Sequence, residues 1–405
     1  MDQAPTSAEG AGPSRLAPSL VALFAIGAGL SVAGLYYNQP ILGVMAAELG
    51  ATPEQIGFVP MLTQLGYAVG LLLFAPLGDR LDRRRVIVAK LAALAAALTL
   101  AGLASSVVLL AAASLAIGLL ATTAQDFVPA AAALAPPAVR GKTVGSVMTG
   151  LLLGILLSRV ASGAISDRFG WRSVFFGAAA TVAALAVVSA ARLPAFVPSA
   201  TDSYGALLRS MAALARDVAP LRRAALVQAL LSVAFSGFWS TLALALAAPP
   251  YHLGSTAAGL FGLAGAAGAV AAPLAGAIAD KRGPGTVIRI GAMLVIASFV
   301  LMALLPGSLA VLIVGTVAFD LGVQACLISH QTIVYGLDPA ARSRVNAVLV
   351  SAMFLGMSVG AALASQAFVR YGWSGVMTLG AAAATLALVV RSLPQRGAAP
   401  TVTEA

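Results

Sequence analysis

Long apolar runs recur along the chain, separated by short stretches of glycine, proline and charged residues. A helix needs about 20 apolar residues to cross the hydrocarbon core of a bilayer, and twelve runs come close to that length or exceed it. Six lie in each half of the chain: 17–46, 54–76, 86–104, 107–134, 143–164 and 174–192, then 224–248, 256–278, 286–305, 308–335, 345–367 and 375–391. This pattern predicts an all-α integral membrane protein with twelve transmembrane helices.

Polar segments stand between and outside these runs. The longest, 193–223, separates the two sets of six and contains apolar residues at helical spacing, namely Leu207, Leu208, Met211 and Leu214. That spacing predicts an amphipathic helix lying along the membrane surface. The expected organisation is, in chain order, a disordered N-terminal tail (1–15), a first six-helix half (16–192), a central loop with the amphipathic helix (193–223), a second six-helix half (224–392) and a C-terminal tail (393–405).

Composition agrees with a membrane protein, because 60% of the residues are hydrophobic and only 9% are charged. A soluble domain carries about 25% charged residues. The formal charge of +10 raises the question of a nucleic-acid partner. The lysines and arginines are scattered between the apolar runs, however, whereas a nucleic-acid surface gathers them on one face. We therefore expect a lipid bilayer around the protein and no nucleic-acid partner.

The basic residues indicate how the spans are oriented. With the N-terminus in the cytoplasm and the spans alternating, 20 of the 24 lysines and arginines fall on the cytoplasmic face. Arg168, Arg172 and Arg370 fall on the far side, and Arg159 lies inside a span. This bias follows the positive-inside rule. We expect both termini and the central loop in the cytoplasm, and the protein in the cytoplasmic (inner) membrane.

Residues that would carry redox, metal or enzyme chemistry are scarce. The single Cys326 cannot form an internal disulfide, and His252 and His330 are far apart in the sequence. No nucleotide-binding loop and no nucleophile with a neighbouring base supports a membrane enzyme, and no soluble sensory domain supports a sensor. We expect no cofactor, no metal site and no enzymatic activity.

Short motifs repeat at an offset of 202 residues, almost half of the 405-residue chain. The pairs are Gly170-Trp171 with Gly372-Trp373, Arg168 with Arg370, and Pro137 to Arg140 with Pro339 to Arg342. Two duplicated six-helix halves place a binding site at their interface near the middle of the membrane, and rocking of one half against the other exposes that site to each side in turn. The repeat predicts a secondary transporter that works as a monomer on a small-molecule substrate.

The loops after the second and eighth runs carry related sequences. The first reads Ala75-Pro-Leu-Gly78-Asp79-Arg80-Leu-Asp82-Arg83-Arg84-Arg85, and the second reads Gly276-Ala-Ile-Ala-Asp280-Lys281-Arg282-Gly283. With these two loops the chain resembles the major facilitator superfamily over essentially its whole length, although Ala75 and Asp82 replace both glycines of the motif in the first copy. The resemblance implies that the loop, through Asp79, Arg80, Arg83, Asp280 and Lys281, gates the two halves. The other interpretation is that its arginines only set topology.

The fifth run has small residues spaced as in the drug:proton antiporter branch of that superfamily. Gly145 and Gly154 are followed by Ser158-Arg159 and by Ser162-Gly163, so Arg159 stands where the branch has proline. The arginine that this branch carries in the fourth helix is absent, because its position falls near Ile117. The resemblance implies efflux of a small organic solute or drug in exchange for protons. The alternative is an importer or facilitator of a small metabolite, with Arg159 holding an anionic group.

Three ionisable residues, Asp126, Arg159 and Asp320, lie well inside apolar runs. A charge at the bilayer centre is costly, so such residues usually face a cavity or a partner, and the plainer interpretation is a buried ion pair. The rise of 1.5 Å per helical residue puts Asp126 and Arg159 at different depths, whereas Asp320 lies closer to the depth of Arg159. Asp126, the preferred candidate, and Asp320 are predicted to carry protons, because a low-dielectric site favours a neutral carboxyl group.

Polar and aromatic residues inside the runs could line a substrate cavity. Pro40 permits a kink in the first run, next to several polar residues. In the superfamily that the chain resembles, the first, fourth, seventh and tenth helices line the cavity, which favours the residues on them. The cavity candidates are Tyr36, Tyr37, Asn38, Gln39, Gln64, Tyr67, Gln125, Arg159, Gln228, Trp239 and Gln324.

Overall fold

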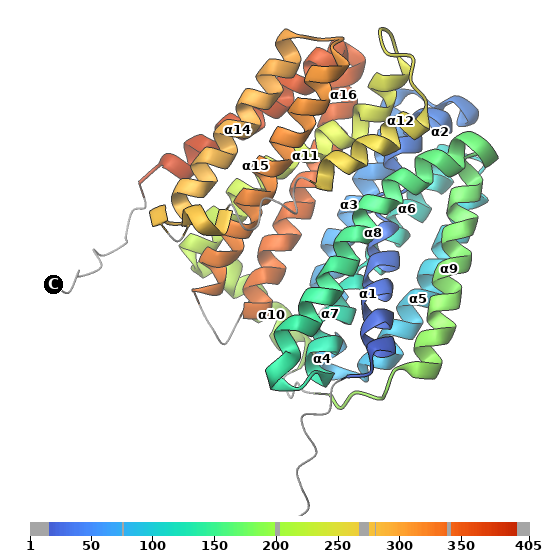
Figure 1. Cartoon of the computed structure of the whole chain (residues 1–405), viewed down its shortest axis with the longest axis vertical. Helices are drawn as coiled ribbons and strands as arrows, with labels where there is room; N and C mark the ends of the chain where they lie inside the picture. Colours follow the sequence, from blue (N-terminus) through green and yellow to red (C-terminus); the bar gives the residue numbers. More distant parts are fainter. Residues whose placement is uncertain are drawn as a thin grey trace, which may run out of the picture.

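The computed structural model describes residues 16–74, 77–198, 203–266, 275–279, 281–337 and 342–394. These residues form α-helices joined by short turns and 3₁₀ segments (Figure 1). The N-terminal half contains α1 (Pro18–Ala33), η1 (Gln39–Ile41), α2 (Leu42–Leu49), α3 (Pro53–Phe74), α4 (Leu77–Arg80), α5 (Arg83–Gly102), α6 (Val107–Ala121), α7 (Thr123–Leu134), η2 (Pro137–Val139), α8 (Arg140–Phe169) and α9 (Trp171–Arg192). The remainder contains α10 (Tyr204–Asp217), α11 (Ala219–Ala247), α12 (Ser255–Leu260), η3 (Phe261–Ala266), α14 (Pro284–Leu304), α15 (Leu309–Tyr335) and α16 (Arg342–Ser392).

Nine helical segments in the described part of the chain are long and apolar enough to cross a membrane. One of them, α16, contains two of the predicted spans, because the backbone turns at Gly372, where φ is 63°. The first predicted span is broken into α1, η1 and α2 around Pro40. The predicted span 256–278 lies partly outside the described residues.

The duplication predicted from the sequence is visible in the packing of the two halves. In the first half α8 crosses α1 with Gly154 against Gly29, and in the second half α16 crosses α11 with Gly360 against Val233. A side chain at Gly154 or Gly360 would collide with the facing backbone. Gly170 and Gly372 occupy equivalent turns, and both have a positive φ, which glycine adopts without steric cost.

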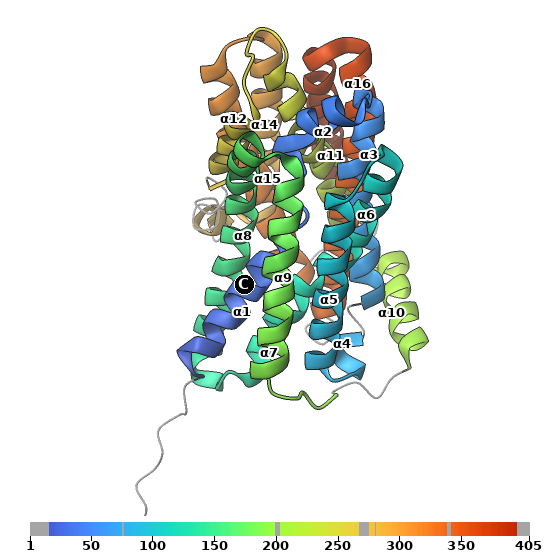
Figure 2. The same cartoon turned by 90° about the vertical axis from the view of Figure 1, so that its right-hand side faces the viewer.

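The two halves lie side by side and meet most closely at one end of the bundle (Figures 1 and 2). We call this the α12 end, because α12 and α2 lie there, and we call the opposite end the α10 end. At the α12 end, α8 packs against α12, where Gly163 touches the Ser255 carbonyl, and α3 packs against α16. Toward the α10 end the ribbons of the halves diverge, and α10 packs against α11 and α16.

Helix α10 touches both halves at its end of the bundle. The Tyr204 hydroxyl donates to the Leu73 carbonyl of α3 at 2.8 Å, and Arg344 of α16 donates to the Ser210 hydroxyl at 3.1 Å. Met211 of α10 is buried. The amphipathic pattern of 193–223 therefore corresponds to a helix that bridges the first half and the second.

Candidate functional site

Arg159 lies in the middle of the protein, where the two halves meet. Its side chain comes from α8 and is 3% exposed. The guanidinium group lies between two aromatic rings, 4.5 Å from the centroid of Tyr36 and 4.4 Å from that of Trp239, and Nε donates to Gln39 Oε1 at 2.8 Å. Tyr36 and Gln39 belong to the break after α1, whereas Trp239 belongs to α11 of the other half. Contacts of a cation with two ring faces and an amide stabilise a charge far from water.

Close packing of α12 and η3 holds the Arg159 backbone in place. A β-carbon at Gly259 would lie 2.5 Å from the Arg159 carbonyl oxygen, and one at Gly262 would lie 2.9 Å from the Arg159 Cβ. Both distances are shorter than real β-carbons show, so both positions require glycine. The two glycines let the second half approach α8 at the level of the arginine.

Asp320 on α15 is the acidic residue of this site and is 2% exposed. It interacts electrostatically with Arg159 and lies beside the Trp239 indole. A β-carbon at Gly265 of η3 would lie 3.8 Å from Asp320 Oδ2. Tyr36, Gln39, Arg159, Trp239 and Asp320 thus converge from four helical segments, and we refer to them as the central cluster.

Several polar atoms of the central cluster make no hydrogen bond. They include Arg159 Nη2 and Asp320 Oδ2, both of them buried. Leaving a buried donor or acceptor unpaired costs about 1–3 kcal/mol, so each such group calls for an explanation, and a role in binding or proton transfer is one of them. The space between Gln39, Pro40, Arg159, Trp239, Leu242, Ala243 and Ala258 is too narrow to admit a water molecule.

A second set of cavity candidates lies next to the central cluster. Gln125 donates to the Tyr67 hydroxyl at 3.1 Å, and the Tyr67 ring lies 4.3 Å from that of Phe354 in the opposite half. Asn38 donates to Thr63 Oγ1 at 3.1 Å. Gln64 is 1% exposed, and its Oε1 accepts no hydrogen bond. This polar layer joins α3 and α7 of the first half to α16 of the second.

The remaining cavity candidates have other surroundings. Gln228 Oε1 accepts from His330 Nδ1 at 2.9 Å, and both residues are fully buried within the second half. Tyr37 and Gln324 are half-buried. None of these residues belongs to the central cluster.

Asp126 lies apart from the central cluster, in a different electrostatic setting. Its Oδ2 accepts from Lys90 Nζ at 2.6 Å, and both side chains are almost fully buried. A β-carbon at Gly78 would lie 3.4 Å from Asp126 Oδ1 and 3.3 Å from Arg83 Nε. Asp126 therefore connects α7 to α5, including Arg83 at its start, and to Gly78 of α4.

Sequence reasoning missed one ionisable residue inside a predicted span, Lys90. The 20 basic residues expected on the cytoplasmic face include Lys90 as a loop residue, and the structure corrects this, because Lys90 is 7% exposed inside α5. The correction lowers the number of basic residues on the expected cytoplasmic face by one and leaves the bias intact. The signal was present in the sequence, since the predicted span 86–104 already contains residue 90.

The gating loops are only partly described. Arg80 and Lys281 are exposed to solvent, and Arg83 is half-buried beside Asp126. The side chain of Asp79 and residue Asp280 lie outside the described residues. Asp82 caps α5, with its Oδ1 accepting from Arg84 N and from Phe196 N, each at 3.0 Å.

Comparison with known proteins identifies the family that has this architecture. The model of the Major Facilitator Superfamily matches residues 24–334 and 224–404. The chain belongs to this superfamily. It is 38% identical over 375 residues to the "Uncharacterized transporter YgaY" of Escherichia coli O157:H7, a match that covers 93% of this chain and 95% of that protein.

Two further similarities extend the comparison. The "Probable transporter SCO4007" of Streptomyces coelicolor is 35% identical over 376 residues, covering 92% of this chain and 87% of that protein. The crystal structure of a mutant of the nucleoside transporter NupG superimposes with a TM-score of 0.76 at 14% identity, covering 92% of this chain and 98% of that chain.

Family membership confirms several expectations drawn from the sequence. The chain is a multi-pass membrane transporter with the major facilitator fold and a small-molecule substrate. As a member of a transporter family it is not an enzyme, as expected. The central cluster lies at the interface where transporters built from repeated halves bind their substrates.

Proposed function

We propose that this transporter moves a small organic solute with an anionic group, and that Arg159 binds that group while Asp320 carries the coupled proton. The observation that carries the proposal is the pair of buried atoms Arg159 Nη2 and Asp320 Oδ2, which lie in one cluster between the halves and have no hydrogen-bond partner. Arginine suits this role because its planar guanidinium group binds carboxylate or phosphate oxygens in pairs.

Electrostatics links the solute and the proton. With Asp320 ionised, its charge offsets that of Arg159, and a second anion is repelled. With Asp320 protonated, Arg159 is left without a balancing charge, and an anionic solute binds more tightly. The same coupling energy acts in reverse, so bound solute favours protonation of Asp320. Solute and proton therefore travel in the same direction, which supports the importer alternative for an anionic metabolite.

The second candidate is proton-coupled efflux by antiport. It is favoured by the small residues of the fifth span, of which Gly154 and Gly163 make close contacts with Gly29 and Ser255. In this mechanism a cationic solute would pair with ionised Asp320 and would compete with the proton for that carboxylate. The nearby Arg159 would repel such a cation, so the charges of the central cluster favour the first candidate.

The sidedness that we propose follows from the distribution of basic residues. The α10 end and both termini face the cytoplasm, the protein lies in the inner membrane, and it acts as a monomer. The conformation is closed at the α12 end, where Asp167 Oδ2 accepts from Thr256 N at 2.8 Å across the two halves. Asp126, Arg83 and the gating loop then lie near the cytoplasmic entrance.

Transport by purified protein in liposomes tests the proposal. A panel of carboxylates, phosphorylated metabolites and organic cations is offered with an imposed pH gradient, acidic inside or outside. We expect an anionic solute to accumulate in the alkaline compartment and the Asp320→Asn variant to lose this accumulation. Accumulation of a cation in the acidic compartment would select the antiport candidate, and no effect of pH on any transported solute would contradict both.

A further inference from the structure

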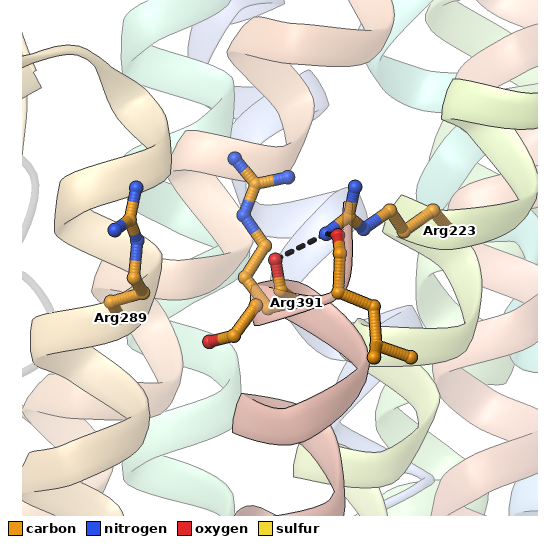
Figure 3. A pocket seen from close by; sticks show the side chains of 5 residues that line it. Arg223, Arg289 and Arg391 are labelled. Atoms are coloured by element: carbon orange, nitrogen blue, oxygen red, sulfur yellow. Dashed lines mark hydrogen bonds between the residues drawn. The ribbon is translucent and has the colours of Figure 1, made fainter. Parts of the chain in front are cut away.

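We propose that a recess at the α10 end of the second half binds the phosphate group of an anionic phospholipid. The recess has a volume of about 310 Å³ and is lined by Arg223, Arg289, Arg391, Ser392 and Leu393. The arginines come from three helices, α11, α14 and α16, and each lies within the first or last two turns of its helix. Figure 3 shows the three guanidinium groups side by side, with Arg391 in the middle.

The packing around the recess fixes the position of its arginines. Arg223 Nε donates to the Val390 carbonyl at 3.2 Å, and its Nη2 donates to the carbonyls of Arg391 and Leu393 at the end of α16 (Figure 3). Arg223 is thus a cap for the C-terminus of α16 as well as a wall of the recess. The Arg391 guanidinium lies against Gly285, where any side chain would displace it.

No described residue balances the charges of the recess. Arg391 experiences the like charges of both Arg223 and Arg289. Among the described residues, the ion pairs are Arg85 with Asp82, Lys90 with Asp126, Arg172 with Glu48, and Arg216 with Asp217, so none involves these three arginines. Three converging cations repel each other, and a bound anion would replace that repulsion by attraction.

The equivalent corner of the first half is built differently. There Asp82 precedes α5, and its carboxylate accepts from two backbone amides and lies 3.8 Å from Arg85 Nε. At the matching position of the repeated loop motif the second half has Gly283, which precedes α14. The first corner therefore contains its own anion, whereas the second has a recess and three arginines in the same place.

The surroundings of the recess favour a phospholipid over free phosphate. On the helices that carry two of the arginines, α14 exposes Ile290 and Met293, and α16 exposes Leu386 and Val389, each with 41–51% of its surface accessible. Leu393 at the rim is 57% exposed. Acyl chains can lie along these apolar side chains while the headgroup phosphate contacts the guanidinium groups, and basic pockets between transmembrane helices bind anionic headgroups in this way.

Lipid binding to the purified full-length protein in detergent tests this inference. Native mass spectrometry counts bound phosphatidylglycerol, with phosphatidylcholine as the zwitterionic comparison and inorganic phosphate as a soluble competitor. Arg289→Gln and Arg391→Gln should each weaken phosphatidylglycerol binding about tenfold, as expected for loss of one charge-assisted contact. Arg192→Gln is the matched control, because Arg192 ends α9 as Arg391 ends the second half, and it is exposed.

Thermal unfolding without lipid separates a binding role from a structural role. Removing one of three like charges should leave the unfolding temperature of Arg391→Gln unchanged or higher, and phosphatidylglycerol should stabilise the wild type more than this variant. Displacement of phosphatidylglycerol by millimolar inorganic phosphate would support the recess as a phosphate-binding site and would identify free phosphate as an occupant as well. Binding that is unchanged in both variants, or lost equally in Arg192→Gln, would overturn the inference. Neither result depends on which solute is transported or on how transport is coupled.

Discussion

Two buried sites in this transporter contain an acidic and a basic side chain, and they differ in how completely these are paired. At Asp126 the carboxylate accepts directly from Lys90 at 2.6 Å within the first half. At Asp320 the carboxylate interacts with Arg159 across the two halves, and Asp320 Oδ2 and Arg159 Nη2 each lack a hydrogen-bond partner. A paired site inside one half moves as a unit, whereas a site shared between halves is remade whenever the halves rock. From this difference we propose a structural role for Asp126 and a transport role for Asp320.

The largest effect is expected from Arg159. Replacing it with alanine removes the charge that binds the solute, and we expect transport in liposomes to fall at least about 100-fold, the equivalent of roughly 3 kcal/mol of charge-assisted binding. Arg159→Lys should retain part of the activity, because lysine keeps the charge but not the planar, paired hydrogen bonds. The control is Arg168→Ala on the exposed end of the same helix, which should transport normally. Full activity of Arg159→Ala would remove the basis for assigning this site.

Asp320→Asn should separate the two sites by their response to pH. Asparagine mimics the protonated acid, so the variant should bind solute and exchange it across the membrane while gradient-driven accumulation falls about tenfold or more. Asp126→Asn, measured in parallel and normalised to the amount of folded protein, should keep accumulation within about twofold of the wild type, since its partner Lys90 is not part of the central cluster. Loss of coupling in Asp126→Asn with normal coupling in Asp320→Asn would reverse the two roles.

Lys90→Met should affect folding more than transport. It leaves Asp126 without its closest cation in a nearly dry environment, and breaking a buried pair in this way costs about 3–5 kcal/mol in soluble proteins. The expected result is a lower unfolding temperature in detergent and less folded protein on size exclusion. The double variant Lys90→Met/Asp126→Asn should recover much of the loss, because no buried charge remains unpaired between the two positions. A single variant as stable as the wild type would show that the pair does not support the first half.

The smallest effect is expected at the far gate. Asp167→Ala removes the carboxylate that accepts from Thr256 N, an end-capping contact worth about 1 kcal/mol. Closure at the α12 end should weaken, and transport rates should change by less than about tenfold while the dependence on pH stays the same. The readout is labelling by a thiol reagent of a cysteine introduced at Ser365 in a Cys326→Ser background, which should increase in the Asp167→Ala variant, because Ser365 is 2% exposed and faces Gly57 of the other half. Unchanged labelling would mean that other contacts close this end.

Much of the fold follows from the sequence because its causes are local or repeated. Runs of about 20 apolar residues need no tertiary information to be recognised as spans, and the 202-residue repeat indicated the division into two halves. The break at Pro40 and the turn at Gly372 also correspond to residues that restrict or free the backbone. The members of the central cluster were all among the predicted residues. Polar groups inside apolar runs can be recognised from the sequence without knowledge of the fold.

The partners of those residues were harder to predict, because helix rotation and packing decide them. Asp126 and Asp320 look alike in the sequence, and only the position of α5 gives Asp126 a cation. The sequence favoured Asp126 for proton coupling, and the geometry moves our preference to Asp320. The recess of Arg223, Arg289 and Arg391 escaped notice because its residues are more than 60 positions apart and each resembles an ordinary topology signal.

The most direct test of the central claim is the proton balance of solute binding. Once the panel has identified a transported solute, it is added to the purified protein in weakly buffered detergent solution, and the pH is followed with an indicator dye. Binding of an anionic solute to Arg159 should cause uptake of up to one proton per solute by the wild type and by Asp126→Asn, and none by Asp320→Asn. Release of protons on binding, or uptake that persists in Asp320→Asn, would contradict the account.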